Sequence, residues 1–311
     1  MESTTIRDHL EYMGLLFAVV PFYYLPRAIS LRLGSSLGWF MAHFVPIRRQ
    51  VAESNIQRAF PEKSRKEVKR IIVRTYQHFG RLVADFIRQD RYVPADMSRL
   101  VTPVNQHLLD EALSGKNGVV VLSGHVGNWE LCGYWLAAMG YPLHAIHRPQ
   151  NNPLVSKYME KKRVAAGGKL ISMFASISAF SAILQDGDLL FVLADQDARD
   201  RGVFVNFFDI PSSTSRGAAI FAQRLNAPII LVFPIRTPDN NYEFIFEQLD
   251  YSASGSGNIA VAILQQYMDR LQYYVRLHPE QYFWFHRRWK TQPVPQKSND
   301  SMAPSLAGAP G

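Results

Sequence analysis

The chain has 311 residues, of which 47% are hydrophobic and 12% aromatic, so it can bury a large core and is not a disordered, solvating segment. Its formal charge of +8 implies an anionic partner, for which nucleic acid, an anionic membrane surface and an acidic carrier protein are candidates. The single cysteine, Cys132, excludes an intramolecular disulfide and suits a reducing compartment.

The N-terminal segment, residues 1–47, holds two apolar stretches. Residues 13–25 read MGLLFAVVPFYYL and residues 37–47 read LGWFMAHFVPI. A spanning helix needs about 20 apolar residues, so the first stretch is short. Pro21 and Pro26 would also kink or end a helix there. We expect this segment to be a membrane anchor, either spanning the bilayer or lying in it as a hairpin; a buried core helix is the alternative.

The next segment predicts a long basic helix. From Val68 to Ile87, apolar residues recur at helical spacing, with Lys and Arg on the other side. The pattern predicts a helix that packs on the core with a solvated basic face. A basic amphipathic helix on anionic lipid is the alternative.

From Gly118 onward, strands and helices alternate. Apolar runs predict strands at 118–124, 142–149, 188–195, 227–237 and 241–249, and amphipathic runs predict helices at 128–140, 152–168, 213–226 and 258–279. This alternation predicts an α/β fold with a mostly parallel central sheet flanked by helices. We expect a catalytic domain over 48–290 and a disordered tail over 291–311, which is rich in Pro, Ser, Gly and Ala.

A histidine and a glutamate stand at the end of the first of these strands, in SGHVGNWE. If Asn128 caps the following helix, His125 lies in the turn and Glu130 in the first helical turn, so their side chains can converge. A carboxylate that holds one imidazole nitrogen leaves the other free to take a proton from a hydroxyl. The alternative is a turn histidine beside an exposed glutamate that favours the helix start.

No convincing nucleophile accompanies this pair. Ser123 lacks the context of a nucleophile elbow, and Cys132 falls inside the next helix. GSSLG around Ser36 matches G-x-S-x-G but does not follow a clear strand. A histidine base without a nucleophile indicates direct attack of a substrate hydroxyl on an acyl donor.

Two further strand ends carry polar residues on the edge where open α/β sheets bind ligands. Arg148 lies in HRPQNNP, and LADQDARDRG supplies Asp195, Gln196, Arg199 and Arg201. Arginine in such a place suits phosphate or carboxylate recognition. Asp195 competes with Glu130 as the carboxylate that orients His125. The sequence predicts no metal site and no nucleic-acid-binding module, because the spacings of both are missing.

Taken in order, SGHVGNWE, HRPQNNP, LADQD, VNFF before a Ser/Thr-rich helix start, and PEQYFWFHRRWK resemble the bacterial lipid A biosynthesis acyltransferases. The resemblance is to the late-acting, lauroyl- or myristoyl-type enzymes, which share H-x4-(D/E) with the glycerolipid-type acyltransferases. It runs from the N-terminal apolar segment to about Lys290.

The resemblance implies an enzyme at the cytoplasmic face of the bacterial inner membrane. It would move an acyl chain from an acyl carrier protein thioester to a hydroxyl of a lipid A precursor, without a cofactor. His125 would be the general base and Glu130 its motif partner, and Arg148, Asp195 and Gln196 would line the site.

The remaining site predictions follow from this mechanism. Backbone amides of the Gly124–Asn128 turn, or Arg148, would stabilise the oxyanion. The acceptor's phosphates would meet Arg199, Arg201 and Arg216. Aromatic residues would line a groove for the acyl chain, namely Trp129, Trp135, Phe207 and Phe208.

Three other functions stay open at this point. The chain could be an acyltransferase that acts on another glycolipid or phospholipid from acyl-CoA. It could be a non-catalytic, membrane-bound lipid-binding protein, which would not need His125. A serine esterase would need Ser36 or Ser123.

Overall fold

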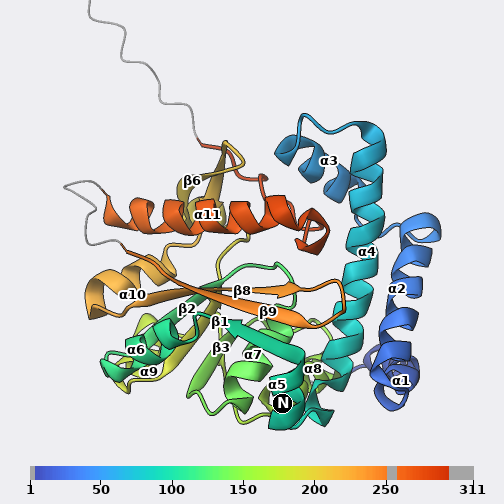
Figure 1. The fold of residues 1–311 in the computed structure, drawn as a ribbon, viewed down its shortest axis with the longest axis horizontal. Helices are drawn as coiled ribbons and strands as arrows, with labels where there is room; N and C mark the ends of the chain where they lie inside the picture. The colour runs from blue at the N-terminus through green and yellow to red at the C-terminus, as the bar shows by residue number, and fades with distance from the viewer. Residues whose placement is uncertain (1–3, 251–257, 294–311) are drawn as a thin grey trace, which may run out of the picture.

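The computed structural model describes residues 4–250 and 258–293 (Figure 1). The described helices are α1 Ile6–Tyr24, α2 Arg27–Phe44, α3 Arg49–Ala59, α4 Arg65–Arg88, α5 Pro94–Leu100, α6 His107–Ser114, α7 Trp129–Ala138, α8 Pro153–Val164, α9 Ile177–Gln185, α10 Gly217–Leu225 and α11 Ile259–Leu277, with 3-10 turns η1 Gln89–Arg91, η2 Arg199–Arg201 and η3 Pro279–Gln281. The described strands are β1 Val101–Val104, β2 Val119–Ser123, β3 Leu143–His147, β4 Lys169–Ser172, β5 Leu189–Leu193, β6 Val203–Phe207, β7 Ile210–Thr214, β8 Ile229–Arg236 and β9 Tyr242–Gln248.

Within the described residues, seven strands form one sheet in the order β1-β9-β8-β2-β5-β3-β4. β8 and β9 pair antiparallel, and the other neighbours pair parallel. The predicted α/β fold with a mostly parallel central sheet is therefore confirmed. Because β2, β5 and β3 are parallel neighbours, their carboxyl ends meet at one edge, and the residues that follow them are brought together there.

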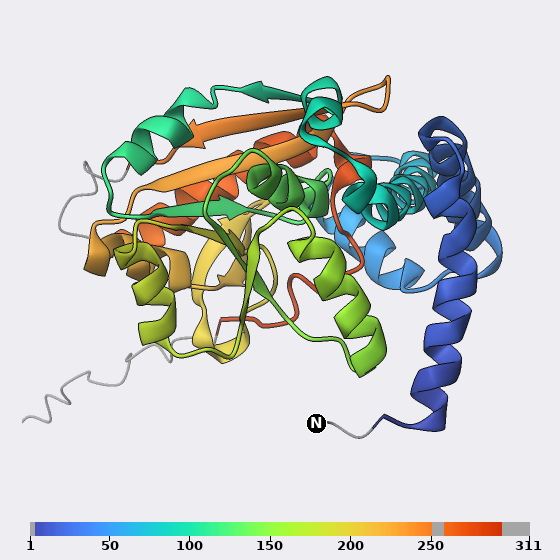
Figure 2. The ribbon, with the colours of Figure 1, turned by 90° about the horizontal axis from the view of Figure 1, so that it is seen from below.

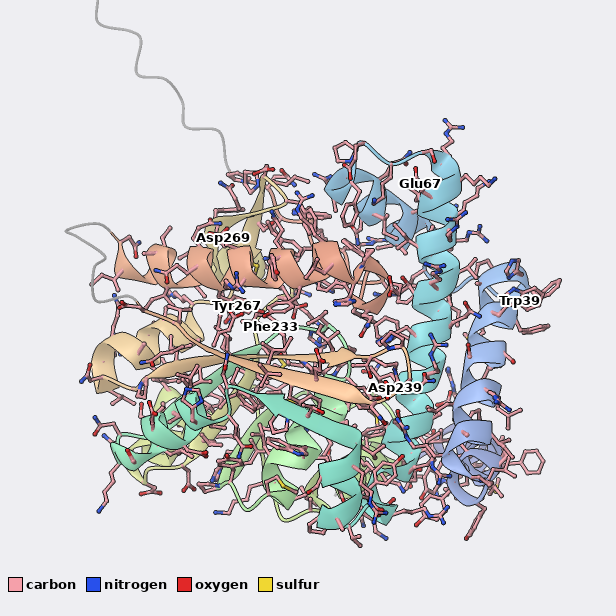
Figure 3. The ribbon with its side chains drawn as sticks, in the orientation of Figure 1. Trp39, Glu67, Phe233, Asp239, Tyr267 and Asp269 are labelled. Atoms are coloured by element: carbon pink, nitrogen blue, oxygen red, sulfur yellow. The ribbon has the colours of Figure 1, made fainter. Side chains whose placement is uncertain are left out.

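The apolar run of β2 fills two cores, one on each face of the sheet. Val120 and Leu122 pack with α10 and α11, whereas Val119 and Val121 pack with α6 and α7. Successive side chains of a strand point to opposite faces, so a strand covered on both sides is apolar throughout. Figure 1 shows α11 above the sheet and α5 and α7 below it, and Figure 3 shows Tyr267 of α11 and Phe233 of β8 between helix and sheet.

Three parts of the chain differ from the sequence-based expectation. Residues 203–214 form a β6–β7 hairpin, so the Ser/Thr run expected at the start of a helix lies in β7 and α10 begins only at Gly217. β4 with α9, and β1 with α5 and α6, were not predicted, because their short segments show weak periodicity. Of the predicted tail, residues 294–311 lie outside the described residues, while Thr291 hydrogen-bonds to Asp197 (2.9 Å).

The N-terminal residues form two consecutive helices, α1 and α2, which run in different directions and meet at a short turn (Figures 1 and 2). We call this pair of helices the N-terminal hairpin (residues 6–44). It lies along the outside of the molecule (Figure 2). Exposed large apolar side chains occur along both helices, including Ile6, Leu10, Phe17, Leu37, Phe40 and Phe44. Among the helices of the described ranges, none combines the length and apolar content needed to cross a bilayer.

Glycines let α2 approach α4 closely. A Cβ atom on Gly80 would lie 1.9 Å from the carbonyl oxygen of Gly34, and one on Gly38 would lie 2.2 Å from the carbonyl oxygen of Tyr76. The two backbones are thus in direct contact where the helices cross. The inward face of α2 is accordingly small and buried at Ser30, Leu31, Gly34, Gly38 and Ala42.

We expect Gly80→Ala to lower the free energy of unfolding by about 2–3 kcal/mol, because the new methyl group must push apart two backbones. Denaturant unfolding measures this change. Gly14→Ala is the control, because nothing lies within 4 Å of that position in α1 and the exchange favours a helix interior by about 1 kcal/mol. Equal effects of the two substitutions would contradict the tight crossing.

Candidate active site

The centre of the candidate site is a histidine–aspartate pair. Asp195 stands two residues after the end of β5, and its Oδ1 lies 2.6 Å from Nδ1 of His125, which stands two residues after the end of β2. The other carboxylate oxygen of Asp195 accepts the backbone N–H of His125 at 2.9 Å. An ionised carboxylate only accepts hydrogen bonds, so the proton of a neutral His125 ring sits on Nδ1 and Nε2 keeps its lone pair.

The second ring nitrogen of His125 faces the outer side of the site. Nε2 of His125 lies 3.3 Å from Nε2 of Gln196, whose side chain is exposed. Because Nε2 of His125 holds a lone pair, the amide group of Gln196 donates this hydrogen bond. A substrate hydroxyl that replaced this amide would donate its proton to the same lone pair. The structure therefore brings together three of the predicted site residues: His125, Asp195 and Gln196.

The charge of Asp195 depends on its partners. Burial alone would raise the pKa of the carboxyl group, which is 2% exposed, but His125 and the nearby Arg288 lower the pKa below its ordinary value. Asp195 is therefore ionised at neutral pH and stabilises the positive charge that His125 gains when it takes a proton.

The turn after β2 holds His125 in place with backbone hydrogen bonds. The N–H of Gly127 donates to the carbonyl of Gln281 (3.0 Å), and the N–H of Asn128 donates to the carbonyl of Pro234 (2.8 Å). Gly127 has a φ of +60°, and a Cβ there would lie 1.7 Å from the Pro234 oxygen, so this position requires glycine.

These bonds correct one part of the expected mechanism. The backbone N–H groups of His125, Gly127 and Asn128 were candidates for the oxyanion hole. They already donate to Asp195, Gln281 and Pro234. The remaining candidates from that prediction are Arg148, which follows β3, and the backbone N–H groups of Gly124 and Val126.

Glu130 lies elsewhere than the spacing argument expected. Its carboxylate forms a two-point ion pair with Arg163 of α8, at 2.6 and 2.9 Å. The pair joins the first turn of α7 to the last turn of α8. It is Asp195, not Glu130, that contacts the His125 ring, because β2 and β5 are neighbours in the sheet and end side by side.

Asn128 is the N-cap of α7, as the sequence indicates. Its Oδ1 accepts the N–H of Leu131 at 3.1 Å, and its Nδ2 donates to the hydroxyl of Tyr242 at 2.7 Å. The side chain is fully buried. The structure thus gives Asn128 a role in shaping the turn, in place of the substrate contact that was predicted.

The four arginines predicted to bind substrate are exposed. Arg148 follows β3, Arg199 and Arg201 lie in η2, and Arg216 precedes α10. β3 is the neighbour of β5 on the far side from β2, so Arg148 follows the third of three adjacent strand ends. Arg199, Arg201 and Arg216 lie around the β6–β7 hairpin, and the structure shows no contact between them and His125.

Aromatic rings surround His125. The ring of Trp129 packs edge-on at a centroid distance of 4.9 Å, and Phe283 lies at 5.9 Å. Phe79 of α4 contacts both Trp129 and Phe283. Of the aromatics expected to line an acyl groove, Trp129 is thus at the site. The others, Trp135, Phe207 and Phe208, are buried in the two cores, because the strands and helices that carry them face inward.

The C-terminal motif PEQYFWFHRRWK supplies residues to which sequence reasoning assigned no role. Nε2 of His286 accepts the N–H of Asp197 at 3.0 Å, which holds the loop after Asp195. Arg288 is 2% exposed and donates to the carbonyl of Ser213 and the hydroxyl of Thr214 at 2.6 and 2.7 Å. Phe283 donates its N–H to the carbonyl of His125 at 2.9 Å. The motif can be recognised in the sequence, but these contacts could not be predicted, because their partners lie far from the motif along the chain.

The candidate nucleophiles do not lie in nucleophile geometry. Ser123 is fully buried and donates to the carbonyl of Val232 at 2.6 Å. Burial raises the pKa of the Cys132 thiol, which keeps it protonated. Ser36 lies inside helix α2, whereas a nucleophile elbow needs a turn between a strand and a helix.

The site has no set of metal ligands. In the part of the chain that the structure describes, no group of three or more His, Cys, Asp or Glu side chains is placed to hold a metal ion. The groups around His125 are an acid, an amide and aromatic rings. They suit proton transfer to and from a substrate oxygen in partly apolar surroundings.

These features define a class of protein: an α/β enzyme fold in which a histidine, held by a buried aspartate, lies at the carboxyl edge of a mostly parallel sheet. The family model for bacterial lipid A biosynthesis acyltransferases matches residues 2–291. The chain therefore belongs to this family and is an O-acyltransferase.

Individual relatives are similar over most of their length. The lipid A biosynthesis lauroyltransferase of Escherichia coli (strain K12) is 24% identical over 285 residues, which cover 90% of each chain. The palmitoleoyltransferase of the same strain is 24% identical over 278 residues, 88% of this chain and 89% of its own. A phosphatidylinositol mannoside acyltransferase of Mycobacterium tuberculosis (strain ATCC 25618 / H37Rv) is 24% identical over 186 residues, 58% of this chain and 57% of its own.

We expect Asp195→Asn to lower kcat by about 10²- to 10⁴-fold, because the amide cannot stabilise a protonated His125. Transfer of an acyl chain to a lipid acceptor measures the loss. Asp188→Asn is the matched control: Asp188 also pairs with a histidine, His144 of β3 at 2.8 Å, but it precedes β5, whereas Asp195 follows that strand. An equal loss in both variants would contradict the assigned role.

Asp195→Asn should also change the response to acid. The pKa of Asp195 is lowered in the folded protein, so its ionised form stabilises the fold above the unfolded pKa of about 4, and that contribution is lost as the pH falls. The free energy of unfolding should therefore fall more steeply below pH of about 4 in the wild type than in Asp195→Asn.

Proposed function

We propose that this protein transfers a fatty acyl chain from an acyl carrier protein thioester to a hydroxyl of a lipid A precursor, at the cytoplasmic face of the bacterial inner membrane. His125 acts as the general base, and no acyl-enzyme forms. The observation that carries the proposal is the 2.6 Å contact between His125 and Asp195, with the other ring nitrogen of His125 turned toward the exposed Gln196.

The reaction runs in one bound complex of donor and acceptor. Nε2 of His125 takes the proton of the acceptor hydroxyl while that oxygen attacks the thioester carbonyl. The C–S bond of the tetrahedral intermediate then breaks, and the imidazolium returns its proton to the departing thiolate. Asp195 stays ionised throughout and lowers the energy of the imidazolium stage.

Arg148 is the proposed oxyanion group. It follows β3, whose carboxyl end is separated from that of β2 only by β5, and its side chain is exposed. The guanidinium is a permanent cation with several donors, so it can meet a developing negative oxygen without a change of protonation.

The proposed donor is an acidic carrier protein, for two reasons. The chain carries a formal charge of +8. The first turns of α4 also present exposed cations, namely Arg65, Lys66, Lys69, Arg70 and Arg74. A positive surface attracts an acidic carrier over a distance and raises its rate of association.

The exposed Arg199, Arg201 and Arg216 are the proposed partners of the acceptor's phosphates.

The N-terminal hairpin is the proposed contact with the bilayer, in which it would lie rather than span. Phe17 of α1 is 85% exposed and Phe40 of α2 is 48% exposed, and Figure 3 shows Trp39 on the outer side of α2. Exposed apolar surface of this extent is typical of a membrane or protein contact. α1 is also tied to the catalytic edge, because Asn152 at the start of α8 donates to the carbonyl of Asp8 and to Glu11, both at 3.0 Å.

Purified protein in phosphatidylethanolamine–phosphatidylglycerol vesicles should acylate a lipid A precursor when given an acyl carrier protein thioester, with the product identified by mass spectrometry. We expect His125→Ala to lower the rate at least about 10²-fold, because the base is lost. Undiminished transfer by His125→Ala would contradict the mechanism.

Parallel reactions separate the alternatives. Transfer from acyl-CoA to another glycolipid or to a phospholipid, with none to the lipid A precursor, would favour the wider acyltransferase function. Vesicle binding without transfer to any acceptor would favour a lipid-binding protein. Release of free fatty acid that is lost in Ser36→Ala would favour an esterase.

Phe17→Glu and Phe40→Glu should each weaken binding to the same vesicles about tenfold or more, because each removes an aromatic ring from the apolar phase. Flotation through a density gradient measures the bound fraction. Leu277→Glu on α11 is the control, since Leu277 is 55% exposed but lies outside the N-terminal hairpin. Binding that falls equally in all three variants would contradict the proposed contact.

A further inference from the structure

A fully buried carboxylate, Asp85 of α4, joins three parts of the fold. Arg27, the first residue of α2, donates to it through Nε and Nη2 at 2.9 and 3.2 Å. Tyr92 and Tyr242 donate their hydroxyls at 3.1 and 2.6 Å. Arg236 of β8 lies 3.2 Å away. We call these five residues the Asp85 hub.

The hub reaches the catalytic turn through Tyr242. Its hydroxyl donates to Asp85 and accepts from Nδ2 of Asn128 at 2.7 Å. Asn128 stands three residues after His125, and its Oδ1 caps α7. Because Asp85 only accepts, the single proton of Tyr242 points to it, and the hydroxyl lone pair must face the amide of Asn128. The charge on Asp85 thus sets the direction of the Tyr242 hydroxyl and, through it, the orientation of the Asn128 amide in the turn.

A second contact runs from α4 to the same turn. Nε2 of His78 lies 2.9 Å from the carbonyl of Gly127. Burial lowers the pKa of His78 to about 3, so its ring is neutral and donates this hydrogen bond from Nε2. Two separate side-chain contacts therefore position the turn after His125: His78 holds Gly127, and Tyr242 holds Asn128.

On its other side, the hub meets the N-terminal hairpin. Arg27 also donates to the carbonyl of Asn240 at 2.6 Å, in the β8–β9 turn that Asp239 marks beside α4 in Figure 3. Arg88 of α4 donates to the carbonyls of Phe22, Tyr23 and Leu25, at the junction of α1 and α2. The hairpin is thus held to α4 by polar bonds at the same end where Asp85 lies.

We propose that Asp85 is a positioning residue that couples the N-terminal hairpin to the catalytic turn, through Arg27 on one side and Tyr242 and Asn128 on the other. Seating of the hairpin on lipid thereby fixes the turn that carries His125. This inference rests on the proposed function, because its effect is measured as the rate of acyl transfer.

Two tyrosines provide a matched test. Tyr92 and Tyr242 both donate a hydroxyl to Asp85, but of the two only Tyr242 also contacts the catalytic turn, where its hydroxyl accepts from Nδ2 of Asn128. Tyr242→Phe should lower kcat about 10- to 100-fold with KM for the thioester unchanged, because the turn is displaced while the binding surface is kept. Tyr92→Phe should lower kcat much less than Tyr242→Phe does, because Tyr92 donates to Asp85 but does not contact the turn.

The link to the hairpin is tested with Arg27→Gln and the double variant with Tyr242→Phe, in protein bound to phosphatidylethanolamine–phosphatidylglycerol vesicles. If one chain of contacts carries both effects, the second substitution adds little to the loss in kcat. Arg27→Lys, which keeps the charge, should restore part of kcat. Vesicle binding should remain in each variant.

Equal losses in Tyr92→Phe and Tyr242→Phe, or losses that multiply in the double variant, would overturn the proposal. If Tyr242→Phe does not fold, the Arg27 variants decide: unchanged kcat with intact vesicle binding overturns it, and reduced kcat with intact binding supports it. A wild-type protein without transfer activity would instead refute the proposed function.

Discussion

The hydrogen bond between Asp195 and His125 is the interaction on which the rest of the site depends. It joins residues 70 positions apart, and it exists because β2 and β5 are parallel neighbours that end at the same level. The second oxygen of Asp195 also holds the backbone of the same histidine. One buried carboxylate therefore fixes both the ring and the main chain of His125, and the charges of His125 and the neighbouring Arg288 lower the pKa of that carboxyl group below its ordinary value.

The two acids that competed for this role have separate tasks. Asp195 orients the His125 ring, whereas Glu130 joins α7 to α8 through its ion pair with Arg163. The pair is partly buried, so breaking it would leave one charge without a partner. A motif of the form H-x4-E can thus be required for the shape of a site even where its acid does not touch the histidine.

Local patterns were enough to predict the elements around the site. The run from Val119 to Ser123 is apolar because both faces of β2 are covered, and Asn128 caps α7 as its position before the helix indicates. Which carboxylate meets His125 could not be decided, because that depends on strand order. The Asp85 hub could not be predicted either, because no local spacing in the sequence relates its members. They come from α2, α4, the chain after η1, β8 and β9.

The glycine crossing of α2 and α4 has a consequence for the protein in water. Because Gly34, Gly38 and Gly80 bring backbone against backbone, the crossing uses almost none of the hairpin's large apolar side chains, and these are left on the outer surface. Exposed apolar surface of this kind is typical of a site that meets a membrane or another protein. The amount of apolar surface on the outside therefore follows from the contact geometry of three glycines and could not be inferred from the overall composition, whose mean hydropathy is only −0.10.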